Sequence, residues 1–537
     1  MSRGGHQSGV VYNVWHYEWF CFIIVEARLK YQKMNRLGFD SQVYLREQAK
    51  AIKQRLSLFP EKLYLEFGGK ILNDFHAARV LPGYEPNIKV KLLQELSSHL
   101  DIILCIYAGD IERRKQRADF GITYDADTLK LIDDLNERNL KVTALVITRY
   151  EEQVSARIFK NKLERQGIRV FTHRYTRGYP TDIDTIVSEE GYGANQFIET
   201  SKPLVIVIGP GPGSGKLATC LSQLYHEHKR GVKAGFSKFE TFPIWDLPLK
   251  HPVNVAYEAA TADLGDFNLV DPYHLEAYNQ RAINYNRDVE AFPLLKRILS
   301  RIAGNGFVYK SPTEMGVNVV SKGIIDDEVV REAARQEIIR RYFRYQCEYI
   351  LGFTEQATLE RAELLMKELN LRPEDRVVVP LARSAAVEAQ KKGKGNNGIF
   401  VGAALELHDG RMVKGYNSPL MHAASSAVLN ALKQLAGIPD HIHLLSPSVL
   451  EQAAYLKENI LGGKAISLDL TEVLTCLAIT VATSPATQLA LDKLKELKGC
   501  EMHLTHMPAS GDETGLRRLG INLTSDPVFA SKNLFPD

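Results

Sequence analysis

One stretch of the chain, residues 203–227, constrains the fold more than any other. It reads PLVIVIGPGPGSGKLATCLSQLYHE. Leu204 to Ile208 is an unbroken apolar run, which predicts a strand buried in a parallel sheet. Four glycines and two prolines fill the next seven residues, and Lys216 and an amphipathic helical pattern follow them. A strand, a glycine-rich turn, a lysine and a helix in this order are typical of a loop that binds phosphate.

The residue types of this loop indicate how a phosphate would be held. Glycines let backbone N–H groups approach an anion, the helix N-terminus adds a partial positive charge, and the lysine adds a full one. The loop could instead be a tight strand-to-helix turn that binds nothing. We predict Lys216 as the catalytic residue. The predicted cofactor-binding residues are Gly209, Gly211, Gly213, Ser214, Gly215, Lys216 and Thr219.

The loop departs from the Walker A pattern at two positions. That pattern has a glycine where this chain has Pro210, and a serine or threonine where it has Leu217. The segment GPGSGK resembles the phosphate loop of adenylate-kinase-like enzymes, in which a hydroxyl comes two residues after the lysine. Here Thr219 comes three residues after it. Since Leu217 cannot bind Mg²⁺, Thr219 or a carboxylate such as Glu240 or Asp271 would have to do so.

Alternating strand and helix patterns surround the loop. Strands are predicted at 62–67, 101–107, 141–148, 169–174 and 233–242, and helices at 90–99, 126–139 and 151–166. This order predicts an α/β protein with Rossmann-like or P-loop-like doubly wound parallel sheets. Such sheets bind ligands at the carboxyl ends of their strands, which here carry Gly68-Gly69-Lys70, Asp110 and Thr148-Arg149-Tyr150. A parallel sheet would also bring Lys238 and Glu240 near the glycine loop.

Two further segments leave alternatives open. Residues 267–271 (FNLVD) could be a short strand that ends in a metal-binding carboxylate, but Asp271 precedes a proline and could equally be a turn residue. Residues 113–125 mix arginines, Lys115 and aspartates, and are either a solvated helix face or an anion-binding edge. A helical pattern covers 326–371, where a solvated face is predicted for Arg335, Arg340, Arg341 and Arg344.

Residues 398–447 form the second informative stretch. A strand, an Asp409-Gly410 turn, a second strand, an apolar helix from Met421 and a further strand are predicted. This order resembles the cytidine-deaminase-like fold, in which a His/Cys-Ala-Glu triplet opens the helix and Pro-Cys-x-x-Cys opens the next one. Here His422-Ala423-Ala424 lacks the glutamate and Pro447-Ser448-Val449-Leu450 lacks both cysteines. We therefore predict a structural His422, no zinc, and a domain that serves as a subunit interface or regulatory surface.

Composition excludes several classes of protein. The chain has 537 residues, 45% of them hydrophobic and 24% charged, with a net charge of +3. This balance argues against nucleic-acid and membrane binding. No apolar run is long enough to cross a membrane. The cysteines form no CxxC pair, which indicates a reducing cytoplasm and argues against disulfides and a cysteine zinc site. They are Cys21, Cys105, Cys220, Cys347, Cys476 and Cys500.

The assembled motifs resemble one bacterial family of unknown function. The matching stretches are LYLEFGGK, HAARVLPG, DFGITYD, PGPGSGKLATCLSQLYHEHKRG, KFETFPIWDLPLKHPVN, EAATADL, NYNRDVE, KSPTEMGVN and LKGCEMH. They run from about residue 38 to 528, so residues 1–33 lie outside the resemblance. It implies a cytoplasmic α/β protein of several domains with a nucleotide loop, and brings no established activity.

These patterns predict four regions. They are an extension or mis-called start at 1–33, a nucleotide-binding region at 34–325, a helical connector at 326–390, and a deaminase-like domain without zinc ligands at 391–537. We expect an enzyme that binds ATP, another nucleotide with Mg²⁺, or another phosphorylated small molecule, for phosphoryl transfer or ligand activation. The alternative is a non-catalytic nucleotide or metabolite sensor with a regulatory C-terminal domain. A homo-oligomer stays open.

Overall fold

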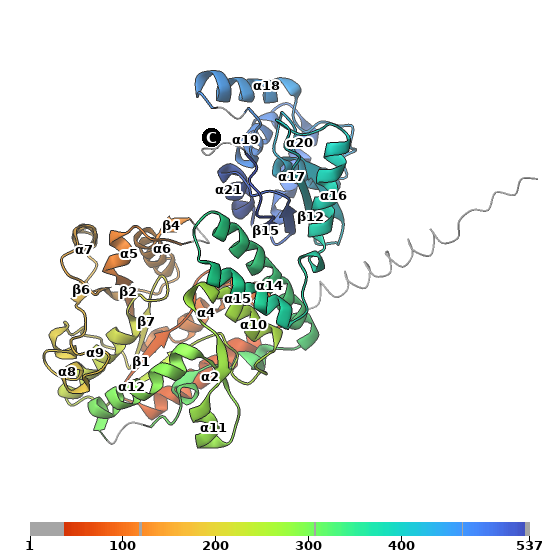
Figure 1. The fold of residues 1–537 in the computed structure, drawn as a ribbon. Coiled ribbons are helices and arrows are strands. Elements are labelled where there is room, and N and C mark those ends of the chain that lie inside the picture. The colour runs from red at the N-terminus through yellow and green to blue at the C-terminus, as the bar shows by residue number, and fades with distance from the viewer. Residues whose placement is uncertain (1–36, 118–120, 305–307, 464–465, 532–537) are drawn as a thin grey trace, which may run out of the picture. The chain divides into compact units, whose positions relative to one another are not determined.

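The structure is a computed structural model that describes residues 37–117, 121–304, 308–463 and 466–531 (Figure 1). The chain divides into two compact units, one formed by residues 37–337 and one that contains the described residues from Ile338 onwards. The boundary falls within helix α14 (Asp327–Ile350). The extension predicted at 1–33 lies outside the described residues. No helix in the described part of the chain is long and apolar enough to cross a membrane.

The first unit is built on a seven-stranded sheet in which every pairing is parallel. Its strands, from edge to edge, are β11 (Gly316–Val317), β8 (Ala234–Phe239), β1 (Lys62–Phe67), β7 (Leu204–Ile208), β2 (Leu100–Tyr107), β5 (Val142–Thr148) and β6 (Val170–His173). All five side chains of β7 are buried, because a central parallel strand is covered on both faces. The sequence thus predicted the parallel sheet and its central strand correctly.

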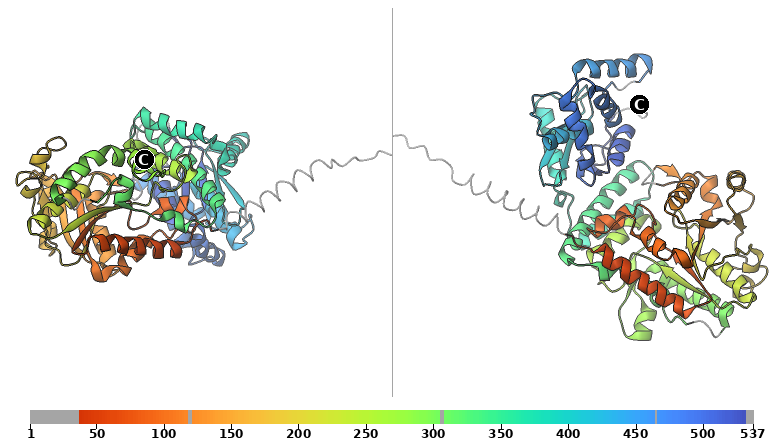
Figure 2. Two further views of the ribbon diagram at one scale, coloured as in Figure 1. Left: turned by 90° about the horizontal axis from the view of Figure 1, so that it is seen from below. Right: turned by 180° about the vertical axis from the view of Figure 1, so that it is seen from behind.

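Helices cover this sheet from both sides. Helices α9 (Lys216–Lys229) and α12 (Asn286–Ala303) pack on the face that carries Tyr64, Val205 and Cys105 (Figure 1). In the view from behind in Figure 2, helix α2 (Ser41–Leu58), in red, runs in front of the sheet. The helices of the unit are α2 (Ser41–Leu58), α3 (Phe75–Val80), α4 (Ile88–Glu95), α5 (Ala108–Glu112), α6 (Tyr124–Asn136), α7 (Val154–Arg165), α8 (Ile183–Ile186), α9 (Lys216–Lys229), α10 (Pro252–Ala260), α11 (Pro272–Tyr278), α12 (Asn286–Ala303) and α13 (Pro312–Met315).

The glycine loop follows the strand at which the strand order of the sheet reverses. From β1 the chain moves outwards to β2, β5 and β6, then returns to insert β7 between β1 and β2, and continues to β8 on the other side of β1. The strand order therefore reverses at β7. Because crossover connections are right-handed, the helices after β1 and after β7 cover opposite faces. In such sheets, the crevice at this reversal point is where ligands bind.

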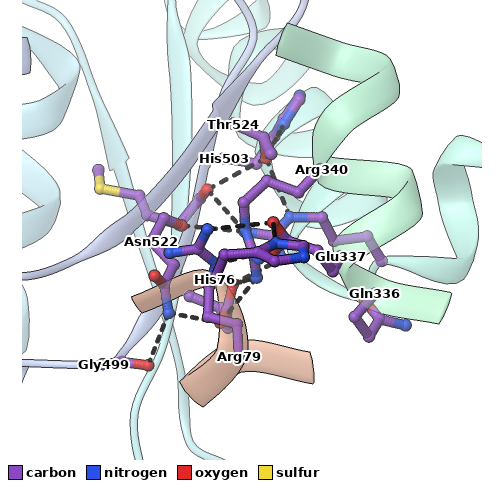
Figure 3. A network of polar contacts seen from close by, with 12 residues as sticks. His76, Arg79, Gln336, Glu337, Arg340, Gly499, His503, Asn522 and Thr524 are labelled. Carbon is purple, nitrogen blue, oxygen red and sulfur yellow. Dashed lines mark hydrogen bonds and ion pairs between the residues drawn. The ribbon is translucent and has the colours of Figure 1, made fainter. Parts of the chain in front are cut away.

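Two short antiparallel ribbons and a buried ion network complete the first unit. The ribbons pair β3 (Gln116–Arg117) with β4 (Ile122–Thr123), and β9 (Asn268–Val270) with β10 (Ile283–Tyr285). Figure 3 shows Glu337 between Arg79 and His76. Arg79 donates two hydrogen bonds to the Glu337 carboxylate, at 2.8 and 3.0 Å, so this fully buried charge is paired.

The second unit has a mixed four-stranded sheet in the order β13-β12-β14-β15. Strands β12 (Gly402–Glu406) and β13 (Met412–Tyr416) form the hairpin predicted around Asp409-Gly410. Strand β14 (Glu501–Leu504) is antiparallel to β12, and β15 (Asn522–Ser525) is parallel to β14. The helices are α15 (Gln356–Glu368), α16 (Val378–Lys391), α17 (Ala423–Ala436), α18 (Pro447–Tyr455), α19 (Leu470–Thr480), α20 (Pro485–Asp492) and α21 (Ser510–Leu519).

The core of this unit joins strand β12 to helix α17. Val401, Ala403 and Leu405 pack against Val428 and Leu432 of α17. The further strand predicted at the end of 398–447 is wrong. Residues 441–446 form no strand, and the third strand of the sheet is β14, which follows three more helices. A short, partly apolar segment such as residues 443–445 (HLL) does not distinguish a strand from a buried loop.

The solvated face predicted for the arginines of α14 is wrong for Arg340. Its side chain is 12% exposed and donates to both carboxylate oxygens of Glu501, at 3.1 and 3.2 Å. Arg376 also donates to Glu501, at 2.6 Å. On β15, Asn522 donates to the carbonyl of Gly499 at 3.3 Å (Figure 3). Two arginines therefore share one half-buried carboxylate, which periodicity within a helix cannot reveal.

Candidate functional site

The glycine loop after β7 is packed too closely for larger residues. A Cβ atom on Gly209 would lie 2.2 Å from the Ser214 hydroxyl oxygen, and one on Gly215 would lie 2.7 Å from Thr148. Gly215 also has a φ of 89°, a left-handed conformation that only glycine adopts without strain. The loop therefore folds back on itself and ends directly at the first turn of α9.

Strand β5 holds two carbonyl groups of the loop. The Thr148 hydroxyl donates to the carbonyl of Ser214 at 2.8 Å, and the Arg149 guanidinium donates to the carbonyl of Gly213. In a trans peptide the C=O and N–H groups point in opposite directions. The N–H groups of Ser214 and Gly215, which share peptides with these carbonyls, therefore point away from β5.

These amides belong to a run of free donors. The N–H groups of Gly213, Ser214, Gly215 and Lys216 have no hydrogen-bond acceptor among the residues that the structure describes. Every helix leaves its first N–H groups unpaired, but here the run begins inside the preceding loop. Together with the partial positive charge of the α9 N-terminus, four consecutive donors form a site suited to an anion.

Lys216 lies at the same place without a partner. Its side chain is half-buried and forms no hydrogen bond or ion pair with any described residue. Beneath the loop, burial raises the pKa of Cys105 to about 12, and the nearby charge of Lys216 acts in the opposite direction. Lys216 therefore adds an uncompensated positive charge on the α9 face of the sheet.

The structure brings most, but not all, of the predicted loop residues together. Gly211 packs against the Tyr124 ring, and Ser214 is 2% exposed with a hydroxyl oxygen that has no partner in the described part of the chain. Thr219, in contrast, is fully buried, and its hydroxyl accepts from the Cys105 thiol at 3.4 Å. Thr219 therefore faces the core and is not available to a metal at the loop. Cys220, on the same helix, is buried and forms no disulfide.

Arg149 adds a second positive charge beside the loop. Its guanidinium carbon lies 3.5 Å from the centre of the Tyr107 ring, and its Nε atom is buried without a described acceptor. The backbone φ of Arg149 is 49°, which is strained for a residue other than glycine. The sequence placed Arg149 correctly at the end of its strand, but could not show that it holds the loop.

A cluster of charged residues lies at the carboxyl end of β8. The Lys238 cluster consists of Lys238, Glu240, Tyr285 and Asp288. The Lys238 ammonium donates to both Asp288 oxygens at 2.6 and 2.7 Å and to the Tyr285 hydroxyl at 2.8 Å, and lies 3.2 Å from Glu240. Tyr285 in turn donates to Glu240 at 2.9 Å. As the sequence predicted, the parallel sheet brings Lys238 and Glu240 to the same edge as the loop.

Burial perturbs the acid–base behaviour of this cluster. It raises the pKa of Glu240 to about 7, against the opposing charge of Lys238. Burial alone would lower the pKa of Lys238, but the charges of Asp288 and Glu240 outweigh it, so that pKa is raised. At neutral pH Glu240 therefore exchanges a proton while Lys238 stays charged, which is the behaviour expected of a group that takes part in proton transfer.

Glu66 is a residue at this edge that sequence reasoning missed. It lies on β1, in register with Lys238 on one side and with Val207 on the other. Its Oε2 atom is buried and has no partner among the described residues. The only signal in the sequence is a glutamate that interrupts the apolar strand KLYLEF, next to the end of the strand.

Of the two alternatives that the sequence left open for Asp271, the structure supports the turn residue. The strand before it, β9, pairs with β10 outside the parallel sheet. Asp271 caps helix α11 by accepting from the N–H groups of Tyr273 and His274, and also accepts from the Thr313 hydroxyl at 2.7 Å. Both of its oxygens are thus used, and the turn interpretation of Asp271 holds.

In the second unit, His422 at the N-terminus of α17 has an acidic partner. Its Nδ1 atom lies 2.7 Å from the Asp512 carboxylate. Burial opposes a charged His422, but the hydrogen bond and charge of Asp512 prevail and raise its pKa. The described residues contain no group of three histidines, cysteines or acidic residues that could hold a metal. The absence of zinc stays a prediction.

Comparison with known proteins finds one family whose two parts match nearly all of the described residues. Residues 37–370 match the family "Domain of unknown function DUF1846, N-terminal", and residues 374–535 match "Domain of unknown function DUF1846, C-terminal". The chain belongs to the DUF1846 family. The prediction of a bacterial family of unknown function is therefore confirmed.

Relatives of the DUF1846 family match over nearly their full length. A UPF0371 protein of Clostridium tetani (strain Massachusetts / E88) is 54% identical over 500 residues, which cover 93% of this chain and 99% of the relative. UPF0371 proteins of Clostridium botulinum strains Langeland and Alaska E43 are 55% and 53% identical over the same shares. The likeness therefore extends across both units.

Proposed function

We propose that the first unit binds the phosphate groups of a nucleotide or of another phosphorylated small molecule at the loop Gly209–Lys216. The observation that carries this proposal is the run of four free N–H donors from Gly213 to Lys216 at the N-terminus of α9. A bound phosphate would accept from these donors, and the unpaired Lys216 ammonium would neutralise part of its charge.

The neighbouring residues favour phosphoryl transfer as the reaction. Lys216 and Arg149 are positively charged groups beside the loop, placed where negative charge grows as a phosphoryl group moves. Glu240 can accept the proton of an attacking hydroxyl group, since its pKa is raised to about 7. The new bond would join that hydroxyl oxygen to phosphorus, the bond from phosphorus to the leaving oxygen would break with its electron pair, and the proton would pass to Glu240.

Binding to the loop is tested by replacing Lys216 with alanine. Calorimetric titration with ATP, ADP and inorganic pyrophosphate is expected to give an affinity for Lys216→Ala about 10- to 100-fold below that of the wild type, because charge-assisted contacts to phosphate are lost. Its melting temperature should stay close to that of the wild type, since Lys216 has no protein partner.

A matched control is available at the opposite edge of the sheet. Lys233 is exposed and directly precedes β8, so it lies at the amino ends of the strands, whereas the loop lies at their carboxyl ends. Lys233→Ala therefore removes the same charge far from the loop. The control should bind as the wild type does. Unchanged affinity in Lys216→Ala would remove the loop from the binding site.

The alternative, a sensor without catalysis, is supported by Leu217, which replaces the hydroxyl residue that P-loop enzymes use to hold Mg²⁺. Turnover separates the two functions. Phosphate release or transfer to an added acceptor, measured with the ligand that calorimetry identifies, supports the enzyme, whereas binding without any product supports the sensor.

A further inference from the structure

We propose that Glu66 is a ligand of a divalent cation, Mg²⁺ in the first place, which binds between its carboxylate and the phosphate held by the glycine loop. This inference rests on the proposed function of the loop and adds to it a metal site and the residue that forms it. It also names the substrate class: a phosphorylated compound that binds as its Mg²⁺ complex.

The position of Glu66 is the first argument. Its strand, β1, is the direct neighbour of β7, and Glu66 pairs with Val207, two residues before the loop. Tyr64, two residues earlier on β1, lies in the core beneath α9, and side chains two apart in a strand share a face. Glu66 therefore lies on the same face as the N-terminus of α9.

The charges of Glu66 and Lys216 reach the same buried groups. Burial is the largest effect on the thiols of Cys105 and Cys220 and raises the pKa of both, and the opposite charges of Glu66 and Lys216 also act on each of them. Both charges thus act on the same two thiols, yet they form no ion pair with one another, and neither side chain forms a hydrogen bond or ion pair with another described residue. Opposite charges on one face of the sheet that do not pair leave room for a group that contacts both.

The unpaired oxygen of Glu66 distinguishes it from the other carboxylates of this edge. Both Asp288 oxygens accept from Lys238, and Glu240 accepts from Tyr285. The buried Oε2 atom of Glu66 accepts from no described donor, and neither does the buried hydroxyl of Ser214 in the loop. A buried carboxylate oxygen without a partner is costly, and a cation is the partner that removes this cost.

The chemistry of Mg²⁺ fits such a partial site. Mg²⁺ keeps several water ligands and is usually bound by one or two carboxylates together with substrate phosphates, not by a complete protein cage. The described residues contain no group of three side chains that could hold a metal alone. Glu66 is therefore expected to bind Mg²⁺ only when a phosphate occupies the loop, and it takes the place of the hydroxyl that Leu217 does not provide.

The experiment compares phosphate binding with and without the metal in the full-length protein. Inorganic pyrophosphate and ATP are titrated by calorimetry into the wild type and into Glu66→Gln, once in EDTA and once in excess Mg²⁺. Glutamine keeps the size of the side chain and removes its charge. Glu61→Gln, at the exposed start of β1, is the matched control, and thermal melting of each variant shows that it is folded.

The expected result is that Mg²⁺ tightens phosphate binding to the wild type but not to Glu66→Gln. Mg²⁺ should tighten binding to the wild type and to Glu61→Gln about tenfold, a typical coupling between two ligands, and should change binding to Glu66→Gln less than about twofold. In EDTA, Glu66→Gln should bind at least as tightly as the wild type, because a like charge beside the phosphate is gone. With Mn²⁺ in place of Mg²⁺, the electron paramagnetic resonance signal of free Mn²⁺ should fall when pyrophosphate is added to the wild type, by much more than it falls with Glu66→Gln.

Two results would overturn the inference, and they differ in what they say about the loop. If both ligands bind in EDTA but Mg²⁺ has the same effect on Glu66→Gln as on the wild type, the loop function stands and Glu66 is not a metal ligand. If neither ligand binds to the wild type in any condition, the proposed function of the loop fails, and the metal site fails with it.

Discussion

The two units place charged residues at helix N-termini in opposite ways. Around α9 in the first unit, the Lys216 ammonium and the Glu66 Oε2 atom have no partner among the described residues. Around α17 and α19 in the second unit, His422 is paired with Asp512, and Asp469 caps α19. Buried polar groups are normally satisfied, so these unpaired charged groups support our proposal of a ligand at α9, whereas the paired charged groups of the second unit have a structural role. The first unit is therefore where we expect ligand chemistry.

The largest effect is expected from a methyl group in the loop. A Cβ on Gly215 would overlap Thr148 and would force a left-handed backbone on alanine, so Gly215→Ala should lower the free energy of unfolding by about 3 kcal/mol. It should also abolish the binding of pyrophosphate, because the N–H groups of the loop no longer converge. Denaturant unfolding and calorimetry measure the two effects.

Gly213→Ala separates the effect of backbone strain from that of close packing. Gly213 also has a positive φ, of 72°, but no atom lies within 4 Å of a Cβ at this position. Only backbone strain remains, and the expected loss of stability is about 1 kcal/mol. If the two variants lose stability and binding equally, the tight packing of the loop against β5 does not determine its function.

The next largest effect is expected at Glu240, which makes the free energy of unfolding depend on pH. Its pKa is raised from 4.5 to about 7 in the folded protein, so the folded state binds this proton more tightly than the unfolded state. The stability that this proton contributes is present below pH 4.5 and is lost as the pH rises to about 7. Glu240→Gln removes this loss and should be more stable than the wild type above pH 7, by an amount on the order of 2 kcal/mol.

The measurement is the free energy of unfolding of both proteins between pH 4.5 and 8. Glu61→Gln, which removes an exposed carboxylate from the same unit, serves as the control and should follow the wild type. Parallel curves for Glu240→Gln and the wild type would show that the Lys238 cluster does not bind the proton in the way described.

The smallest effect is expected in the second unit, at His422. Because Asp512 raises the pKa of His422 despite its burial, the pair contributes stability that is present below pH 6.5 and is lost as the pH rises through the raised pKa. His422→Gln should reduce this loss by about 1 kcal/mol. The exposed His443 offers the control His443→Gln.

Metal analysis tests the same pair in another way. Protein purified without a histidine tag should contain no stoichiometric zinc, because one imidazole cannot replace the three protein ligands of a catalytic zinc site. Zinc that is present at one equivalent in the wild type and lost in His422→Gln would contradict the structural role of His422 and would bring the second unit into the chemistry.

The sequence predicted those parts of the fold that follow from local patterns. The apolar runs of β1, β2, β5 and β7 define the parallel sheet, and Asp409-Gly410 defines the hairpin of the second unit. It failed where the pattern was short, as at residues 441–446, and it left two roles open for Asp271. In the first case β12 pairs with the distant strand β14, and in the second the distant Thr313 donates to the carboxylate.

The loop and its strand could be predicted from the sequence alone. Four glycines with their conformational freedom, a lysine and an apolar strand pattern are all features of consecutive residues. The charges that gather at the loop's end of the sheet follow instead from the tertiary structure. Glu66 and Lys238 lie on two strands and Arg149 directly follows a third, and the strand order β8-β1-β7-β2-β5 brings them to one edge of the sheet. Whether a charge at that edge has a partner depends on the distances between side chains of different strands, which no local pattern contains.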